Sequence, residues 1–151
     1  MPTIIKGQIY FHYLVDAFHF RERTDLKQFI KGLLTREGKQ IDTINYIFCT
    51  DEYLLTLNKK HLDHNTLTDI ITFEYNPPEE PVLSDIYISV ERVKENASLF
   101  KVSFIRELHR VIFHGALHLS GFKDKTSEQA QLMRKKEEEY LHRWNVSRGT
   151  A

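Results

Sequence analysis

The chain has a single cysteine, Cys49, among its 151 residues, so no disulfide can form within it. Cys49 is expected to act as a small apolar residue near a strand end instead of as a nucleophile. Neither charge is in excess, because 21 lysines and arginines balance 21 aspartates and glutamates. This balance argues against non-specific coating of nucleic acid, although it is compatible with a local basic groove.

Long apolar runs are also missing. No segment is apolar over the length that a bilayer requires, and none near the first residues resembles a signal peptide. We therefore expect a cytoplasmic protein without membrane partners. Hydrophobic residues make up 41% of the chain and charged residues 28%, as in ordinary globular proteins. The length favours one domain with a real core over residues 1–151, and the oligomeric state stays open.

Apolar periodicity and turn residues predict the order of helices and strands. Strands are predicted around residues 9–14, 44–49, 69–75 and 83–90. The first predicted helix has Thr24 as its cap and carries an apolar stripe, and the second follows Thr50. Three more helices are predicted over 91–100, from Ser103 through the histidines, and from Thr126 to about Trp144. The order β-α-β-α-β-β followed by three helices predicts an α+β fold, with a small mixed four-stranded sheet and about five helices packed on it.

The most informative segment is 114–124, which holds two histidines four residues apart, a glycine and an aspartate. Residues i and i+4 share one face of a helix, so His114 and His118 can reach the same ion. Gly121 permits a left-handed turn that carries Asp124 back over the same point. Two histidines and a carboxylate leave one tetrahedral position open, as in catalytic zinc sites. The segment therefore predicts a metal site at the end of a helix in a metal-dependent hydrolase.

The spacing also matches the zinc-peptidase pattern H-E-x-x-H-x-x-G-x-x-H at both histidines and the glycine. Gly115 stands where those peptidases have the glutamate that acts as general base, which argues against peptide hydrolysis. A metallohydrolase of another substrate class, such as a phosphodiesterase, stays open as an alternative. No general base stands out, and Asp69 and Asp85 at strand edges are expected to be structural.

Two charged features near this segment are expected to lie at the solvated surface. Glu107 lies two helical turns before His114, which predicts an ordinary surface glutamate. The run from Arg134 to Glu139 predicts a solvated face of the last helix, with lysines and glutamates paired at i,i+4.

Four stretches together resemble the YbeY family of bacterial metalloproteins. H-G-A-L-H-L-S-G-F at 114–122 is similar to that family's H-G-x-L-H-L-x-G-Y. L-N at 57–58 with L-T-D-I-I-T-F at 67–73 resembles its L-N…P-T-D-V-L-S-F. S-D-I-Y-I-S at 84–89 resembles G-D-I-x-I-S, and Met133 with Glu137 resembles M-x-x-x-E. The likeness extends over about residues 40–141.

The resemblance implies a single-domain zinc endoribonuclease. It implies a role in maturation of ribosomal RNA, notably at the 3′ end of the small-subunit RNA, and in ribosome quality control. RNA is then the expected partner, as ribosomal RNA or as the small ribosomal subunit. By the same resemblance, His114 and His118 are the first two zinc ligands.

Two departures from the family pattern have chemical consequences. The family's third ligand is a histidine, and here Asp124 takes that place. A carboxylate oxygen is an acceptable zinc ligand but a harder one, so we expect one Zn²⁺ ion or another divalent metal that prefers oxygen. The second departure is Leu62, which stands where the family has an arginine. Leucine cannot recognise phosphate as a guanidinium does.

Binding of the RNA backbone would then depend on other basic side chains. The candidates for a basic groove are Lys59, Lys60, Arg106, Arg110 and Lys123. Leu62 also keeps a second function open, namely a ribosome-assembly factor whose metal site is structural or only weakly catalytic.

Overall fold

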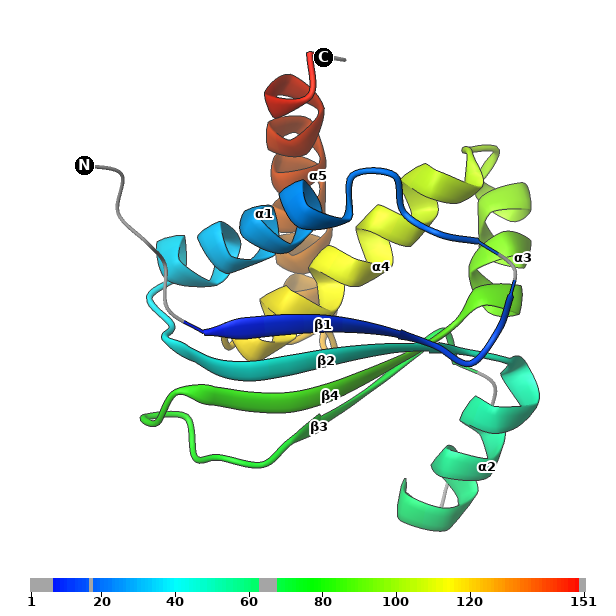
Figure 1. The fold of residues 1–151 in the computed structure, drawn as a ribbon, viewed down its shortest axis with the longest axis horizontal. Helices are drawn as coiled ribbons and strands as arrows, with labels where there is room; N and C mark the ends of the chain where they lie inside the picture. The colour runs from blue at the N-terminus through cyan, green and yellow to red at the C-terminus, as the bar shows by residue number, and fades with distance from the viewer. Residues whose placement is uncertain (1–6, 17, 63–67, 150–151) are drawn as a thin grey trace.

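Four strands form one mixed sheet in the computed structural model of the chain, which describes residues 7–16, 18–62 and 68–149. The strands are β1 (Gln8–Tyr13), β2 (Ile41–Cys49), β3 (Ile70–Glu74) and β4 (Val82–Ser89). They lie in the order β1-β2-β4-β3 (Figure 1). β2 pairs in parallel with β1 and β4, whereas β3 runs antiparallel to β4. β3 therefore forms one edge of the sheet.

Five helices among the described residues surround this sheet. They are α1 (Arg23–Arg36), α2 (Asp51–Leu62), α3 (Val90–Phe100), α4 (Phe104–Leu119) and α5 (Ser127–Ser147). α1, α4 and α5 lie on one side of the sheet, whereas α2 projects on the opposite side at one end (Figure 1). The predicted α+β class, with a mixed four-stranded sheet and about five helices, is confirmed. No described helix combines the length and the apolar character that crossing a membrane requires.

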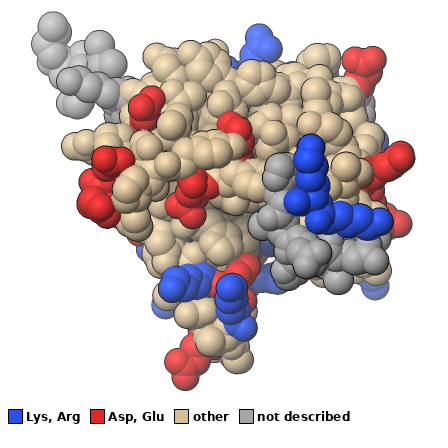
Figure 2. Space-filling view, turned by 90° about the horizontal axis from the view of Figure 1, so that it is seen from below, with Lys and Arg blue, Asp and Glu red and all other residues tan. Residues whose placement is uncertain are grey.

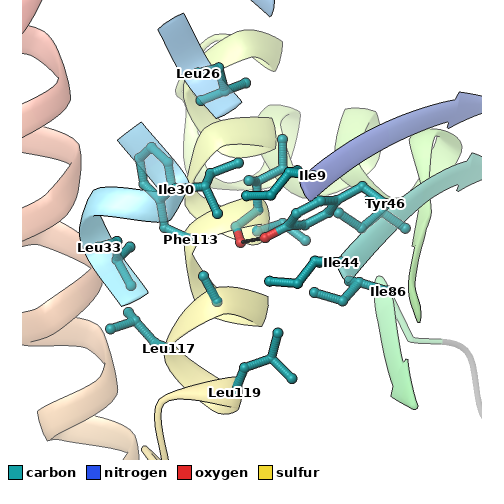
Figure 3. Close-up of a cluster of buried hydrophobic side chains, with 14 of the residues drawn as sticks. Ile9, Leu26, Ile30, Leu33, Ile44, Tyr46, Ile86, Phe113, Leu117 and Leu119 are labelled. Carbon is teal, nitrogen blue, oxygen red and sulfur yellow. Dashed lines mark hydrogen bonds between the residues drawn. The ribbon is translucent and has the colours of Figure 1, made fainter. Parts of the chain in front are cut away.

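The main core lies between the sheet and the helices α1 and α4, where apolar side chains from both layers interlock (Figure 3). Tyr46 of β2 is fully buried there, and its hydroxyl donates a hydrogen bond to the carbonyl of Ile112 at 3.0 Å. Burial raises the pKa of Tyr46, so the hydroxyl keeps its proton and remains a donor. This bond ties the middle of α4 to the centre of the sheet.

A smaller cluster covers the other face of the sheet. Leu54 of α2 packs with Cys49 and Ile71, and all three are buried. Burial raises the pKa of the Cys49 thiol to about 12, so it is neutral at physiological pH and unsuited to nucleophilic attack. Cys49 is thus the small apolar residue that the sequence predicts.

Three of the predicted helix caps are present. Thr50 and Ser103 accept hydrogen bonds from backbone N–H groups three residues later, and Thr126 forms a capping box with Gln129. The prediction for Thr24 is wrong, because α1 begins one residue before it and Glu22 takes the cap position without a side-chain cap bond. The Glu22 carboxylate is instead held at 2.7 Å by Arg148, which comes from beyond α5.

The anchoring role of Tyr46 can be tested. Tyr46→Phe should lower the free energy of unfolding by about 1 kcal/mol, because it removes one buried hydrogen bond and little volume. Urea denaturation followed by circular dichroism measures this difference. Tyr10→Phe is the control, since Tyr10 is 45% exposed on β1 and its loss of a hydroxyl should leave stability unchanged. Equal stability of the Tyr46→Phe variant and the native chain would contradict the anchor.

Candidate metal centre

Three side chains converge at the C-terminal end of α4. His114 and His118 lie one helical turn apart, and their ring centroids are 5.1 Å from each other. Asp124 approaches both rings: its carboxylate oxygens lie 3.3 Å from His114 Nε2 and 3.6 Å from His118 Nε2. One ligand atom of each residue lies within 4.8 Å of the other two. Two ligand atoms at about 2.1 Å from one tetrahedral ion are about 3.4 Å apart, so the three residues fit a zinc-sized cation.

The turn after α4 brings Asp124 to this position. Gly121 has a φ of 104°, in the left-handed region that favours glycine. Around it, Gly121 N–H donates to the carbonyl of His118 and Phe122 N–H donates to that of Leu117. These bonds close the helix end and reverse the chain, as the sequence predicts. The capping box of α5 begins two residues after Asp124, so both flanks of the aspartate are fixed.

Gly115 lies on the side of α4 that faces the sheet. A Cβ at this position would be 3.1 Å from Ile70 and 3.2 Å from Ile86. Contacts this short would require the two isoleucine side chains to shift, so the small residue lets α4 approach β3 and β4 closely. The position at which zinc peptidases have their glutamate base is therefore buried against the sheet in this chain.

Glu137 of α5 contacts His114 at Nδ1, the ring nitrogen that does not face Asp124. Its Oε2 lies 2.6 Å from His114 Nδ1, and only 2% of its side chain is exposed. Burial alone would raise the pKa of Glu137, but the hydrogen bond with His114 and the charge of Arg110 outweigh it and lower the pKa. An ionised carboxylate only accepts, so Nδ1 carries a proton, and Nε2 is the ring nitrogen on the side of Asp124. This is the carboxylate–histidine arrangement that orients metal ligands in proteins.

The expected solvated face from Arg134 to Glu139 is therefore wrong at Glu137. Within this run of charged residues, Glu137 is buried because α5 packs on α4 there. The sequence did carry a signal for it, namely the match of Met133 and Glu137 to the M-x-x-x-E pattern.

Glu107 is a second correction, because it is buried instead of a surface glutamate, with 2% of its side chain exposed. Arg110, one turn later, donates from Nε and Nη2 to both oxygens of Glu107 at 2.9 and 2.7 Å. Its Nη1 donates to Glu137 at 3.0 Å, and Nη2 lies 3.7 Å from a carboxylate oxygen of Asp69. A continuous chain of contacts thus runs from Glu107 through Arg110 and Glu137 to His114.

The three candidate ligands open onto a hollow of about 710 Å³ at the β3 edge of the sheet. Its walls come from α2, from β3 and the residues just before it, from α4 and from the loop that follows α4. Asp69 is part of this wall; burial raises its pKa, while the charges of Arg110 and His114 oppose the rise. Asp85 is not part of it and accepts hydrogen bonds from Tyr75 and Asn45.

Of the basic residues predicted to form a groove, Arg110 and Lys123 lie at the candidate metal centre or beside it, whereas Arg106 lies elsewhere. Arg110 lines the hollow, although carboxylates already occupy its donors. Lys123 lines an adjoining hollow together with His118 and Asp124. Arg106 pairs with Glu138 at 3.1 Å and lines a different depression.

Lys59 and Lys60 are exposed near the end of α2. Figure 2 shows Lys and Arg side chains at α2 on one side of the face in view, with acidic side chains and further Lys and Arg side chains elsewhere on it. Asn58, the residue before Lys59 and Lys60, lines the hollow, whereas neither lysine is among its lining residues. The side chains of His61 and Leu62 lie outside the described residues, and the effect of Leu62 therefore stays a prediction.

The family model and the named relatives agree on one family. The family model described as "Endoribonuclease YbeY" matches residues 16–145. A Flavobacterium psychrophilum protein with that name is 48% identical over 138 residues, which cover 91% of this chain and 97% of the relative. A Christiangramia forsetii protein with the same name is 45% identical over 93% of this chain and 97% of its own length. A solution structure from Thermotoga maritima aligns with a TM-score of 0.62 at 24% identity and covers 93% of each chain, which supports the fold.

The carboxylate behind His114 can be tested without any substrate. Glu137→Gln should weaken metal binding by about 10- to 100-fold, because the amide no longer holds the proton on Nδ1 as strongly. Competition with a chromophoric chelator measures the affinity. Glu138→Gln is the matched control, since Glu138 is half exposed and pairs with Arg106. If both variants bind metal as tightly as the native chain, Glu137 does not orient the ligand.

Proposed function

Because the chain belongs to the YbeY endoribonuclease family, we propose that it is a metal-dependent endoribonuclease that acts in ribosomal RNA maturation. The proposal includes the 3′ end of the small-subunit RNA and ribosome quality control. The observation that carries it is the convergence of His114, His118 and Asp124 on one point of an open hollow, within a fold shared with relatives named as endoribonucleases. The expected partners are ribosomal RNA or the small ribosomal subunit. The proposed location is the cytoplasm, and residues 1–151 are proposed to form one domain.

The donor set supports a divalent cation, proposed as one Zn²⁺ ion. When bound, such an ion supplies a Lewis acid and an activated water for attack on a phosphodiester. His114, His118 and Asp124 would hold it, and Glu137 fixes the imidazole of His114 in the tautomer that binds. The carboxylate of Asp124 also suits a harder ion such as Mn²⁺, so the ligand set permits either metal.

Arg110 makes the neighbourhood compatible with RNA. The carboxylates of Glu107, Glu137 and Asp69 all lie within 4 Å of its guanidinium. Without that charge, three carboxylates beside Asp124 would repel a phosphodiester. Arg110 is therefore proposed to act on RNA through charge balance, and the lysines at the rims supply direct phosphate contacts.

The engagement of Arg110 also favours a second candidate function. A catalytic site for RNA commonly offers a free guanidinium to phosphate, whereas Arg110 donates to two carboxylates and Leu62 replaces the family arginine. An assembly factor that binds the small ribosomal subunit through a structural or weakly catalytic metal site would share this arrangement. Cleavage of RNA separates the two functions.

The cleavage test compares the native chain with His114→Ala, each loaded with zinc, on unstructured RNA and on small-subunit RNA that includes the 3′ end. His114→Ala should lose cleavage by about two orders of magnitude or more, because it removes a ligand. His142→Ala, at an exposed position of α5, is the control and should cleave as the native chain does. Cleavage that survives in His114→Ala removes the metal mechanism. Metal binding without cleavage of any RNA by the native chain selects the assembly factor.

The role of Asp124 has its own test. Asp124→Ala should lower metal affinity by about an order of magnitude or more, since it removes one of three donors. Asp124→His should retain binding and shift the ratio of zinc to manganese affinity toward zinc, because imidazole is the softer ligand. Glu128→Ala, exposed in the first turn of α5, is the matched control. An unchanged affinity in Asp124→Ala would show that the third ligand is another group.

A further inference from the structure

The candidate metal centre lies where two hollows meet. Beside the larger one, a second hollow of about 400 Å³ is bounded by the β3–β4 connection, by the loop after α4 and by Lys39 after α1. Four residues line both hollows: Glu74, His118, Asp124 and Lys125. A polymer attached at the metal centre can therefore extend into both. The function proposed above involves only the candidate metal centre, where the two hollows join.

We propose that the second hollow is a nucleotide subsite, which takes the nucleoside and the phosphate next to the scissile bond on one side. This inference rests on the endoribonuclease activity proposed above and specifies how its substrate lies. A volume of about 400 Å³ is within the range of about 300–1,000 Å³ that small-molecule sites occupy, and it suits a single nucleotide. The larger hollow then receives the chain on the other side of the scissile bond.

The charges in the second hollow fit a phosphate. Lys39, Lys123 and Lys125 line it, against the carboxylates of Glu74 and Glu80 outside the candidate ligands. The larger hollow has Lys125 and an Arg110 whose donors carboxylates already occupy. A phosphate is therefore drawn more strongly to the second hollow than to the first.

The apolar wall of the second hollow fits a base. Phe122 lines it from the loop after α4, and Pro77 and Pro78 line it from the β3–β4 connection. Flat aromatic side chains stack on bases without regard to sequence. The lining thus combines an aromatic ring with lysines, which is the composition of single-strand binding sites.

The β3–β4 connection is held in place before any ligand arrives. Asn76 donates to the carbonyl of Pro81 at 2.9 Å, and Glu80 N–H donates to Pro77 at 3.0 Å. Lys39 Nζ donates to the carbonyl of Pro78 at 3.1 Å. A lysine ammonium has three donors, so this bond leaves Lys39 able to contact a phosphate while it is held at the rim.

Lys39→Ala tests the subsite, because Lys39 lines only the second hollow of the two and is far in sequence from the candidate ligands. The probe is a fluorescent 2′-O-methyl hexauridylate that binds zinc-loaded protein at low salt, followed by anisotropy. Lys39→Ala should weaken binding about fivefold or more and reduce the slope of log affinity against log salt by about one. Its zinc affinity should match that of the native chain. Lys135→Ala, exposed on α5 and outside both hollows, should change neither.

Shortening the probe locates the effect. When nucleotides are removed one at a time from each end, removal from only one end should give a probe that native and Lys39→Ala proteins bind equally. Native protein that binds and cleaves RNA while Lys39→Ala binds every probe equally well would overturn the subsite and leave the proposed function intact. Native protein that neither binds a probe nor cleaves RNA would overturn both.

Discussion

The candidate site depends on one buried ionic arrangement, in which Arg110 lies between Glu107 and Glu137. Both carboxylates are about 2% exposed, and burying either one without a partner would cost several kcal/mol. Burial alone would lower the pKa of Arg110, but its bonds to Glu107 and Glu137 raise it, so the guanidinium stays charged. Because Glu107 and Arg110 belong to α4 and Glu137 to α5, the arrangement also joins the two helices. Rotation of the His114 ring would break its bond to Glu137, so the ring stays oriented.

This arrangement divides the cations of the chain into two kinds. Arg110 is internal, and its charge balances carboxylates that would otherwise repel a phosphodiester. Lys123 and Lys125 are exposed, whereas Lys39 is half-buried and donates to the carbonyl of Pro78, and all three bring positive charge to the edge of the site. A guanidinium with its directed donors suits the first role, and a flexible ammonium suits the second. The resemblance puts Leu62 where the family has an arginine, and we expect this replacement to remove a directed phosphate contact that lysines near the site can compensate only by charge.

Much of the fold and part of the site could be predicted from sequence, because they depend on local patterns. Apolar periodicity located the strands and helices, and Ser103 and Thr126 marked helix starts through backbone bonds three residues away. The spacing of the two histidines relies only on helical geometry. The burial of Glu107 was missed although its partner Arg110 lies only three residues later, and Glu137 was missed for the opposite reason. Glu137 bonds to residues 23 and 27 positions earlier, and a charge is expected at the surface until such a tertiary partner is known.

Close packing of α4 on the sheet determines where the chemistry can take place. At Gly115, a side chain would meet Ile70 and Ile86 at 3.1–3.2 Å, so that face of the helix serves the core and only the neighbouring edge remains for ligands. A larger residue at this position would press its Cβ against the side chains of Ile70 and Ile86, which would have to shift by a few tenths of an ångström. The close approach of α4 to β3 and β4 therefore suits a small residue at the position where zinc peptidases have their glutamate base, and among the described residues the other carboxylates that line the hollow with the three candidate ligands are Asp69 and Glu74.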